Sequence, residues 1–152
     1  MANAFKRLQK EIDRLERCTK DLRLTDPRDD KNRIEDTKGG LLENSYCWVI
    51  KNPEFQQWRG DQQSRLLWIK GDPGKGKTML LCGIIDEIGE TLPKSNLLSY
   101  FFCQATDSRI NNATAVLRGL IYMLVNQQPF LLSHILDKYE QAGKVLFEDA
   151  NA

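Results

Sequence analysis

Hydrophobic residues recur at intervals of three and four near the amino end of the chain, at Phe5, Leu8, Ile12, Leu15 and Leu22. This spacing places the apolar side chains on one face, and Pro27 disfavours helical geometry before it, so the pattern predicts an amphipathic helix over 5–22. Thr19 interrupts the apolar stripe, and a coiled coil needs about three to four sustained heptads. A helix that docks on the domain, or links to something upstream, is therefore favoured over an oligomerising stalk.

Helical and strand-like patterns then alternate along the chain. The polar stretch 26–40 ends in a glycine pair and is predicted to be a connecting segment. Short apolar runs followed by polar or glycine residues predict buried strands over 65–71 and 96–104. Apolar residues at helical spacing, with proline and asparagine at the boundaries, predict helices over 41–52, 53–60, 77–92, 111–128 (capped by Asn111 or Asn112) and 129–143.

The order of these elements indicates the fold class. A strand, a glycine-rich turn, a helix, a second strand and two helices are typical of an α/β domain with parallel strands. We expect an amphipathic helix and linker over 1–25 and the α/β domain over 26–152.

The glycine-rich turn carries the strongest chemical signal. Residues 71–78, GDPGKGKT, satisfy the phosphate-loop pattern G-x-x-x-x-G-K-[ST], with a predicted strand directly before them and a predicted helix directly after. A helix start offers unpaired main-chain N–H groups and the positive end of the helix dipole to an anion. Glycines allow the backbone to curl around a phosphate where a Cβ would obstruct it.

These features predict a nucleotide site with Mg²⁺. Lys77 is expected to reach the β- and γ-phosphates, and the Thr78 hydroxyl to ligate Mg²⁺. Lys75 is better explained as a solvated loop residue than as a second phosphate ligand. The predicted cofactors are ATP or GTP with Mg²⁺, and the predicted loop residues are Gly71, Asp72, Pro73, Gly74, Lys75, Gly76, Lys77 and Thr78.

Composition narrows the classes of partner. The 152 residues carry 22 basic and 21 acidic side chains, so a net charge of +1 gives no case for nucleic acid or an anionic membrane. No apolar run approaches the roughly 20 residues that cross a bilayer, and the amino end lacks a secretory signal. The four cysteines are scattered, without a C-x-x-C pair, so we expect reduced thiols and a cytoplasmic protein.

With the phosphate loop and its surroundings taken together, residues 21–152 closely resemble the fungal NACHT NTPases. The stretch from DPRDDKNRIEDTKGG through KGDPGKGKTMLLCGIIDEI, and the later LLSYFFCQATDSRINNATAVLRGLIYMLVNQQP, carry the resemblance. These proteins belong to the STAND class of signalling ATPases and include heterokaryon-incompatibility proteins, and their amino-terminal NTPase segment is also described as nephrocystin-like. The resemblance implies a nucleotide-dependent switch in fungal self/non-self recognition or cell-death signalling, with an effector domain upstream and a sensor downstream.

The resemblance also implies a role for Arg109 and points to a motif of the family that this sequence lacks. Arg109 stands where related domains place an arginine near the terminal phosphate, although a solvated loop arginine is an equal alternative. The family's strand ending in paired acidic residues is absent, since Asp86 and Glu87 fall inside a predicted helix. We therefore expect an incomplete domain with weak or no hydrolysis, whose unpaired strands favour association with another chain or with a missing downstream domain. No catalytic residue is assigned.

Two other functions remain open. A small P-loop kinase also carries the loop pattern, but it needs arginine-rich lid segments late in the chain, and residues 129–152 contain no arginine. A degenerate interaction module that works through the amino-terminal helix would not need the intact pair Lys77 and Thr78.

Overall fold

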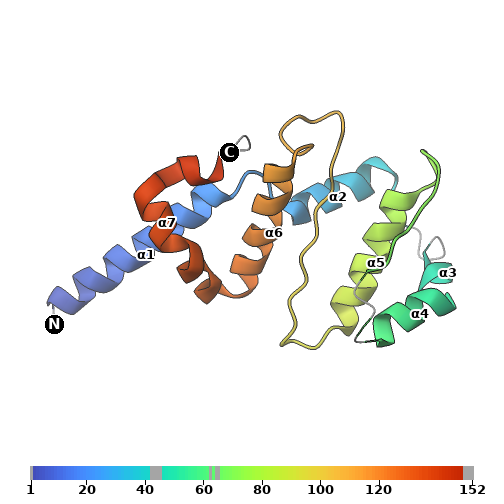
Figure 1. The fold of residues 1–152 in the computed structure, drawn as a ribbon, viewed down its shortest axis with the longest axis horizontal. Coiled ribbons are helices and arrows are strands. Elements are labelled where there is room, and N and C mark those ends of the chain that lie inside the picture. Colours follow the sequence, from blue (N-terminus) through green and yellow to red (C-terminus); the bar gives the residue numbers. More distant parts are fainter. Residues whose placement is uncertain (1, 42–45, 62, 64–65, 149–152) are drawn as a thin grey trace. The chain divides into compact units, whose positions relative to one another are not determined.

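The computed structural model describes residues 2–41, 46–61, 63 and 66–148. Its secondary structure is helical (Figure 1). The elements are α1 (Ala2–Leu22), α2 (Pro27–Thr37), α3 (Cys47–Ile50), α4 (Pro53–Gly60), α5 (Lys77–Thr91), α6 (Ala113–Gln127), the 3-10 helix η2 (Pro129–Leu132), α7 (Ser133–Ala142) and the 3-10 helix η3 (Gly143–Phe147). None of the helices in the described ranges is long and apolar enough to cross a membrane.

The chain divides into two compact units. Unit 1 comprises residues 1–30 and 97–152, and unit 2 comprises residues 31–96. The boundary falls inside α2, whose first turn belongs to unit 1. Each unit has its own hydrophobic core.

The core of unit 1 joins α1 to α6, α7 and η3. Its buried side chains come from α1, α6, η2, α7 and η3, and Figure 1 shows the α1 and α7 ribbons side by side. Gly119 allows α6 to pack closely, because a Cβ there would lie 2.4 Å from the Phe101 ring and 3.2 Å from Pro27. The buried core residues are Cys18, Leu22, Tyr122, Val125, Leu132, Leu136 and Phe147.

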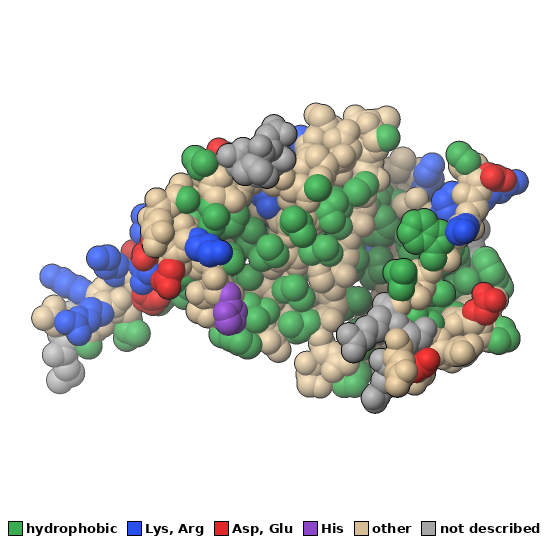
Figure 2. Space-filling model, viewed as in Figure 1, with side chains coloured by type: hydrophobic (Ala, Val, Ile, Leu, Met, Phe, Trp, Pro, Cys, Tyr) green, Lys and Arg blue, Asp and Glu red, His purple; other side chains and the backbone are tan. Residues whose placement is uncertain are grey.

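The α1 helix confirms the amphipathic pattern, but only half of its apolar stripe is covered. Leu15 packs against the core, whereas Phe5, Leu8 and Ile12 are exposed. Lys and Arg side chains gather around the same end of the helix (Figure 2). The docked part of the helix agrees with the expectation of a helix that packs on the domain.

Unit 2 is built around α5. The α5 residues Leu80 and Ile84 form a core with Val49 and Phe55, which come from α3 and α4. Gly83 lets a ring approach this helix, since a Cβ there would lie 2.2 Å from Tyr46. Further hydrophobic side chains pack against this core, among them Trp58, Leu67 and Ile69.

The predicted α/β fold with parallel strands is wrong. Within the described residues no strand is present: 66–70 and 97–104 are extended but pair with no other strand. Leu66 and Trp68 are 76% and 71% exposed, so the first segment is not buried on both faces as predicted. A strand needs a neighbouring backbone for its ladder, and a short apolar run does not provide one.

Helix α6 takes the place of a strand partner for the second segment. The Gln127 side chain accepts a hydrogen bond from Leu98 N at 3.1 Å and donates one to Leu98 O at 2.8 Å. Tyr100 N approaches the Met123 sulfur at 3.5 Å. Side chains of α6 therefore form the contacts with this extended backbone that a neighbouring strand would otherwise provide.

Other sequence predictions have mixed outcomes. The helices predicted over 5–22, 53–60, 77–92 and 111–128 are confirmed, and 129–143 begins with a 3-10 turn before α7. The prediction of a connecting segment over 26–40 is wrong for most of its length, because α2 occupies Pro27–Thr37. The prediction for 41–52 is confirmed only as α3, and its residues 42–45 lie outside the described residues.

Candidate functional site

The loop 71–78 leads directly into α5 of unit 2. Gly74 and Gly76 have φ of 78° and 74°, a left-handed conformation that glycine adopts without a steric penalty. Gly76 is the residue preceding α5, and its carbonyl accepts the hydrogen bond from Leu80 N at 2.9 Å. Residues 71–76 are exposed, so a ligand can reach the loop backbone.

Lys77 places a positive charge inside this loop. Its Nζ donates hydrogen bonds to the carbonyl oxygens of Gly71 at 2.6 Å and Asp72 at 2.7 Å. The side chain therefore turns back from the first turn of α5 across the loop. A Cβ on Gly71 would meet only this side chain, at 3.6 Å, which is ordinary contact.

The other loop residues are exposed to solvent. Thr78 is exposed in the first turn of α5, and Asp72 and Pro73 are exposed ahead of it. Lys75 is also exposed, and its main-chain N–H points to Asp72 O at 3.4 Å. Because the start of a helix carries partial positive charge, this arrangement suits an anion.

The helix behind the loop is firmly held. The side chain of Lys31 on α2 is buried, and its Nζ lies 2.6 Å from Glu35 and 2.8 Å from Asp86 on α5. Glu87, the next residue of α5, lies 3.8 Å from Arg59. The adjacent acidic pair of α5 lies inside this helix, as predicted, and both of its carboxylates form ion pairs within unit 2.

Arg109 belongs to unit 1, whereas the loop belongs to unit 2. Its guanidinium donates to both carboxylate oxygens of Asp107, at 3.0 and 2.7 Å. This contact raises the pKa of Arg109 above its usual value. The structure brings residues 71–78 together, and the predicted role of Arg109 at a terminal phosphate stays a prediction.

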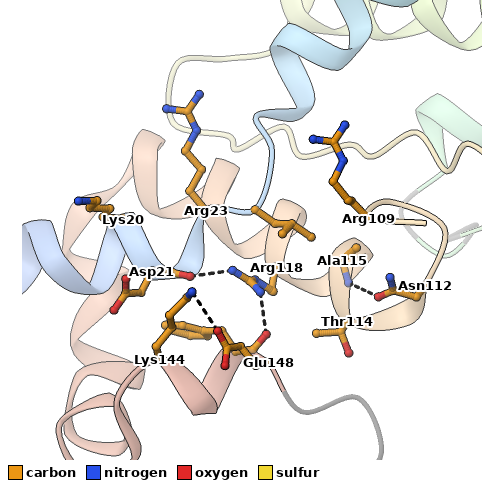
Figure 3. Close-up of a pocket in the computed structure, with 12 residues that line it drawn as sticks. Lys20, Asp21, Arg23, Arg109, Asn112, Thr114, Ala115, Arg118, Lys144 and Glu148 are labelled. Carbon is orange, nitrogen blue, oxygen red and sulfur yellow. Dashed lines mark hydrogen bonds and ion pairs between the residues drawn. The ribbon is translucent and has the colours of Figure 1, made fainter. Parts of the chain in front are cut away.

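A second feature of the structure is a pocket of about 560 Å³ in unit 1 (Figure 3). It is lined by the end of α1, the start of α6 and η3. No sequence motif indicates it, because its lining residues come from three distant stretches. Its charged and polar lining residues are Lys20, Asp21, Arg23, Arg109, Asn112, Thr114, Arg118, Lys144 and Glu148.

Arg118 forms the base of this pocket and is 8% exposed. It donates to the main-chain oxygens of Asp21 at 2.7 Å, Leu22 at 3.0 Å and Phe147 at 2.9 Å. Figure 3 shows the guanidinium directed at the end of α1 and at η3. Burial lowers the pKa of Arg118 below its usual value. It thereby ties together three elements of unit 1.

Metal and histidine chemistry receive no further support. In the described part of the chain, no group of three or more His, Cys, Asp or Glu residues could hold a metal ion. The chain's single histidine, His134, lies exposed on α7, where Figure 2 shows it at the surface. The Thr78 hydroxyl therefore remains the one predicted Mg²⁺ ligand.

Comparison with known proteins places the chain in a family. A family model described as Nephrocystin 3, N-terminal, matches residues 44–151, and the chain belongs to this family. Over 148 residues, 97% of the chain, it is 64% identical to the vegetative incompatibility protein HET-E-1 of Podospora anserina. The chain spans 11% of that relative's length. No solved structure matches it.

Proposed function

We propose that residues 71–78 bind the phosphates of ATP or GTP together with Mg²⁺. The observation that carries this proposal is the position of the Lys77 ammonium, which lies 2.6 Å from Gly71 O and 2.7 Å from Asp72 O at the start of α5. A cation held there, beside exposed main-chain N–H groups, offers charge and hydrogen bonds to a triphosphate.

Binding would proceed by exchange of partners. The two carbonyl oxygens that hold the Lys77 ammonium are weaker partners than phosphate oxygens, which carry formal charge. A triphosphate would take over the ammonium and accept hydrogen bonds from the first N–H groups of α5. Thr78 would ligate Mg²⁺ bridging to the phosphates.

The biological role is proposed from the comparisons. The name of the relative describes vegetative incompatibility, and we extend that role to this chain as the nucleotide-binding part of a signalling protein in fungal self/non-self recognition. Nucleotide state would act as the switch in a cytoplasmic protein, and self-association or a further domain would be its partner. We propose binding with little hydrolysis, since the acidic pair Asp86 and Glu87 lies inside α5 and not at the end of a strand.

The test is a titration of the 152-residue chain with fluorescent ATP, with and without Mg²⁺. Lys77→Ala should weaken binding about 10- to 100-fold, because a hydrogen bond to a charged group contributes about 1.5–3 kcal/mol. Thr78→Ala should abolish only the increase in affinity that Mg²⁺ provides. Lys75→Ala is the matched control, since it removes a lysine of the same loop that is predicted to be solvated.

Two results would contradict the proposal. Equal affinities for the parent chain and Lys77→Ala would show that the loop does not hold the phosphates. An effect of Lys75→Ala as large as that of Lys77→Ala would mean that only the net positive charge matters. Competition with unlabelled ATP and GTP decides the base preference, and phosphate release measures hydrolysis.

A further inference from the structure

We propose that the pocket of unit 1 binds a small anion that carries two or more phosphate groups. This pocket is lined by the end of α1, the start of α6 and η3, and all of its lining residues belong to one unit. The proposal is independent of nucleotide binding by the loop 71–78, which lies in unit 2.

The charge of the lining favours an anion. The pocket gathers the basic side chains of Lys20, Arg23, Arg109, Arg118 and Lys144 around two carboxylates, Asp21 and Glu148. Two of these basic groups have partners outside the lining, since Arg109 pairs with Asp107 at 2.7 Å and Arg23 lies 3.5 Å from Asp29. With those two carboxylates counted, one positive charge remains in excess at the pocket. Walls of low dielectric strengthen the field of such a cluster and raise the local concentration of counter-ions.

Both carboxylates are already engaged. The Asp21 carboxylate accepts a hydrogen bond from the Tyr139 hydroxyl at 2.5 Å, a contact that raises the pKa of Tyr139 to about 12. Glu148 lies 3.0 Å from the Lys144 ammonium. Lys20 forms no ion pair within the described residues. Figure 3 shows Lys144 beside Glu148 and Lys20 apart from them.

Arg118 gives the pocket a fixed positive base. Its guanidinium is held by three main-chain carbonyls, and none of the carboxylates in the described residues forms an ion pair with it. Carbonyl dipoles satisfy its donors but do not cancel its charge. The Glu148 and Asp21 carboxylates attract this cation without forming an ion pair with it, and burial still lowers its pKa. A bound anion nearby would offset more of the cost of burying the charge. Since Arg118 is already ordered, little side-chain entropy is lost on binding.

Size and surroundings favour a small phosphorylated ligand over a nucleic acid. A cavity of about 560 Å³ lies within the range of small-molecule sites, about 300–1,000 Å³. The N-terminal turn of α6, with Thr114 and the Asn112 cap, adds a helix dipole of the correct sign. A polymer of phosphates is bound by an extended basic surface, whereas the whole chain has a net charge of only +1.

Pyrophosphate is the probe, and calorimetric titration is the measurement. The 152-residue chain carrying Lys77→Ala is used with a chelator, so that neither the loop lysine nor Mg²⁺ contributes. Failure of nucleotide binding by the loop would leave this experiment unaffected, because the loop is already disabled. The proposal predicts saturable binding that weakens as salt is added.

Pocket variants should change the affinity in opposite directions. Replacing Lys20 and Lys144 by glutamine should weaken pyrophosphate binding about tenfold or more, as expected for lost hydrogen bonds to a charged ligand. Glu148→Gln should tighten binding, because it removes a repelling carboxylate and releases Lys144. Damage to the fold would not tighten binding. Lys6→Gln with Lys138→Gln is the matched control, as both lysines are exposed in unit 1 away from the pocket.

Three outcomes would overturn the proposal. One is the absence of saturable pyrophosphate binding by folded protein, with folding checked by circular dichroism. Another is an equal loss of affinity in the control pair, which would mean that overall charge and not the pocket attracts the anion. The third is an unchanged or lower affinity in Glu148→Gln.

Discussion

Arg118→Met removes the buried guanidinium that ties α1, α6 and η3 together. Methionine is long and unbranched, so it fills much of the space of the arginine stem without its donors. The substitution leaves the main-chain oxygens of Asp21, Leu22 and Phe147 without their partner in the folded protein. We expect a large loss of stability in unit 1.

The magnitude follows from the three contacts. A hydrogen bond to a charged group contributes about 1.5–3 kcal/mol, so three such bonds would give roughly 4.5–9 kcal/mol if they were additive. Burying the guanidinium costs several kcal/mol, and its lowered pKa reflects that cost. Water in the adjacent pocket can also hydrate some of the freed carbonyls. The expected net loss is about 3 kcal/mol.

Urea denaturation followed by circular dichroism measures this loss. Tryptophan fluorescence would not serve, because Trp48, Trp58 and Trp68 all lie in unit 2. Amide hydrogen exchange adds a local measurement, and the last turn of α1 should exchange faster in the variant. Arg7→Met, an exposed arginine on the same helix, is the control and should change stability by less than about 0.5 kcal/mol.

A loss below about 1 kcal/mol for Arg118→Met would refute this reasoning, because it would be no larger than that of one ordinary hydrogen bond. So would faster exchange spread evenly over both units, since the three contacts all lie in unit 1.

Three further predictions concern packing and titration. Gly119→Ala should destabilise by about 1–3 kcal/mol despite the better helix propensity of alanine, because its Cβ would lie 2.4 Å from the Phe101 ring, and Phe101→Leu should relieve part of the cost. Burial raises the pKa of the Cys82 thiol from 9.0 to about 11, so the exposed Cys103 should be alkylated before Cys82 at pH 8. Because the unfolded chain releases the Cys82 proton at a lower pH than the folded chain, the free energy of unfolding should fall as the pH rises from 9 towards 11. Hydrogen bonds from the Arg28 side chain lower the pKa of Asp26, so the stability that the Asp26 carboxylate contributes should be lost as the pH falls below about 3.8. In Asp26→Asn the free energy of unfolding should therefore depend less on pH in this acidic range.

Thermal denaturation over a pH series and mass spectrometry of alkylated peptides measure these effects. A stabilising Gly119→Ala would show that the ring moves aside at no cost. Equal alkylation rates for Cys82 and Cys103 would contradict the burial of the first thiol. The same dependence of thermal stability on pH below about pH 3.8 in Asp26→Asn and in the parent chain would contradict the assigned titration.

Local signals in the sequence predicted the helices well. The Asn52 side chain accepts from Glu54 N at 2.8 Å, and the Asn112 side chain accepts from Ala115 N at 2.9 Å, so both helix starts follow from cap chemistry visible in the sequence. Pro53 at the first position of α4 is a similarly local signal.

Helix α2 was missed because its stability is not local. It has few apolar residues, and the buried Lys31 binds it to Asp86, 55 positions away. Pro27 followed by Asp29 and Asp30 is typical of a helix start and was the one available signal.

The conformation of the two predicted strands and the formation of the pocket depend on tertiary partners. The apolar run at 66–70 specifies burial of Leu67 and Ile69 but not a neighbouring strand, and the run at 97–104 is completed by Gln127. The pocket brings Lys20, Arg118 and Lys144 together from three separate stretches, which no local pattern encodes. By contrast, the candidate phosphate loop is contiguous and could be predicted from eight residues.

Amide hydrogen exchange of the peptide spanning 71–80, with and without ATP and Mg²⁺, tests most directly whether main-chain groups of this loop grip a triphosphate. We predict slower exchange from Gly74 to Met79 when nucleotide and Mg²⁺ are both present, and much less slowing in Lys77→Ala at the same nucleotide concentration. Unchanged exchange across this peptide at saturating nucleotide, in a chain that is folded, would contradict this prediction.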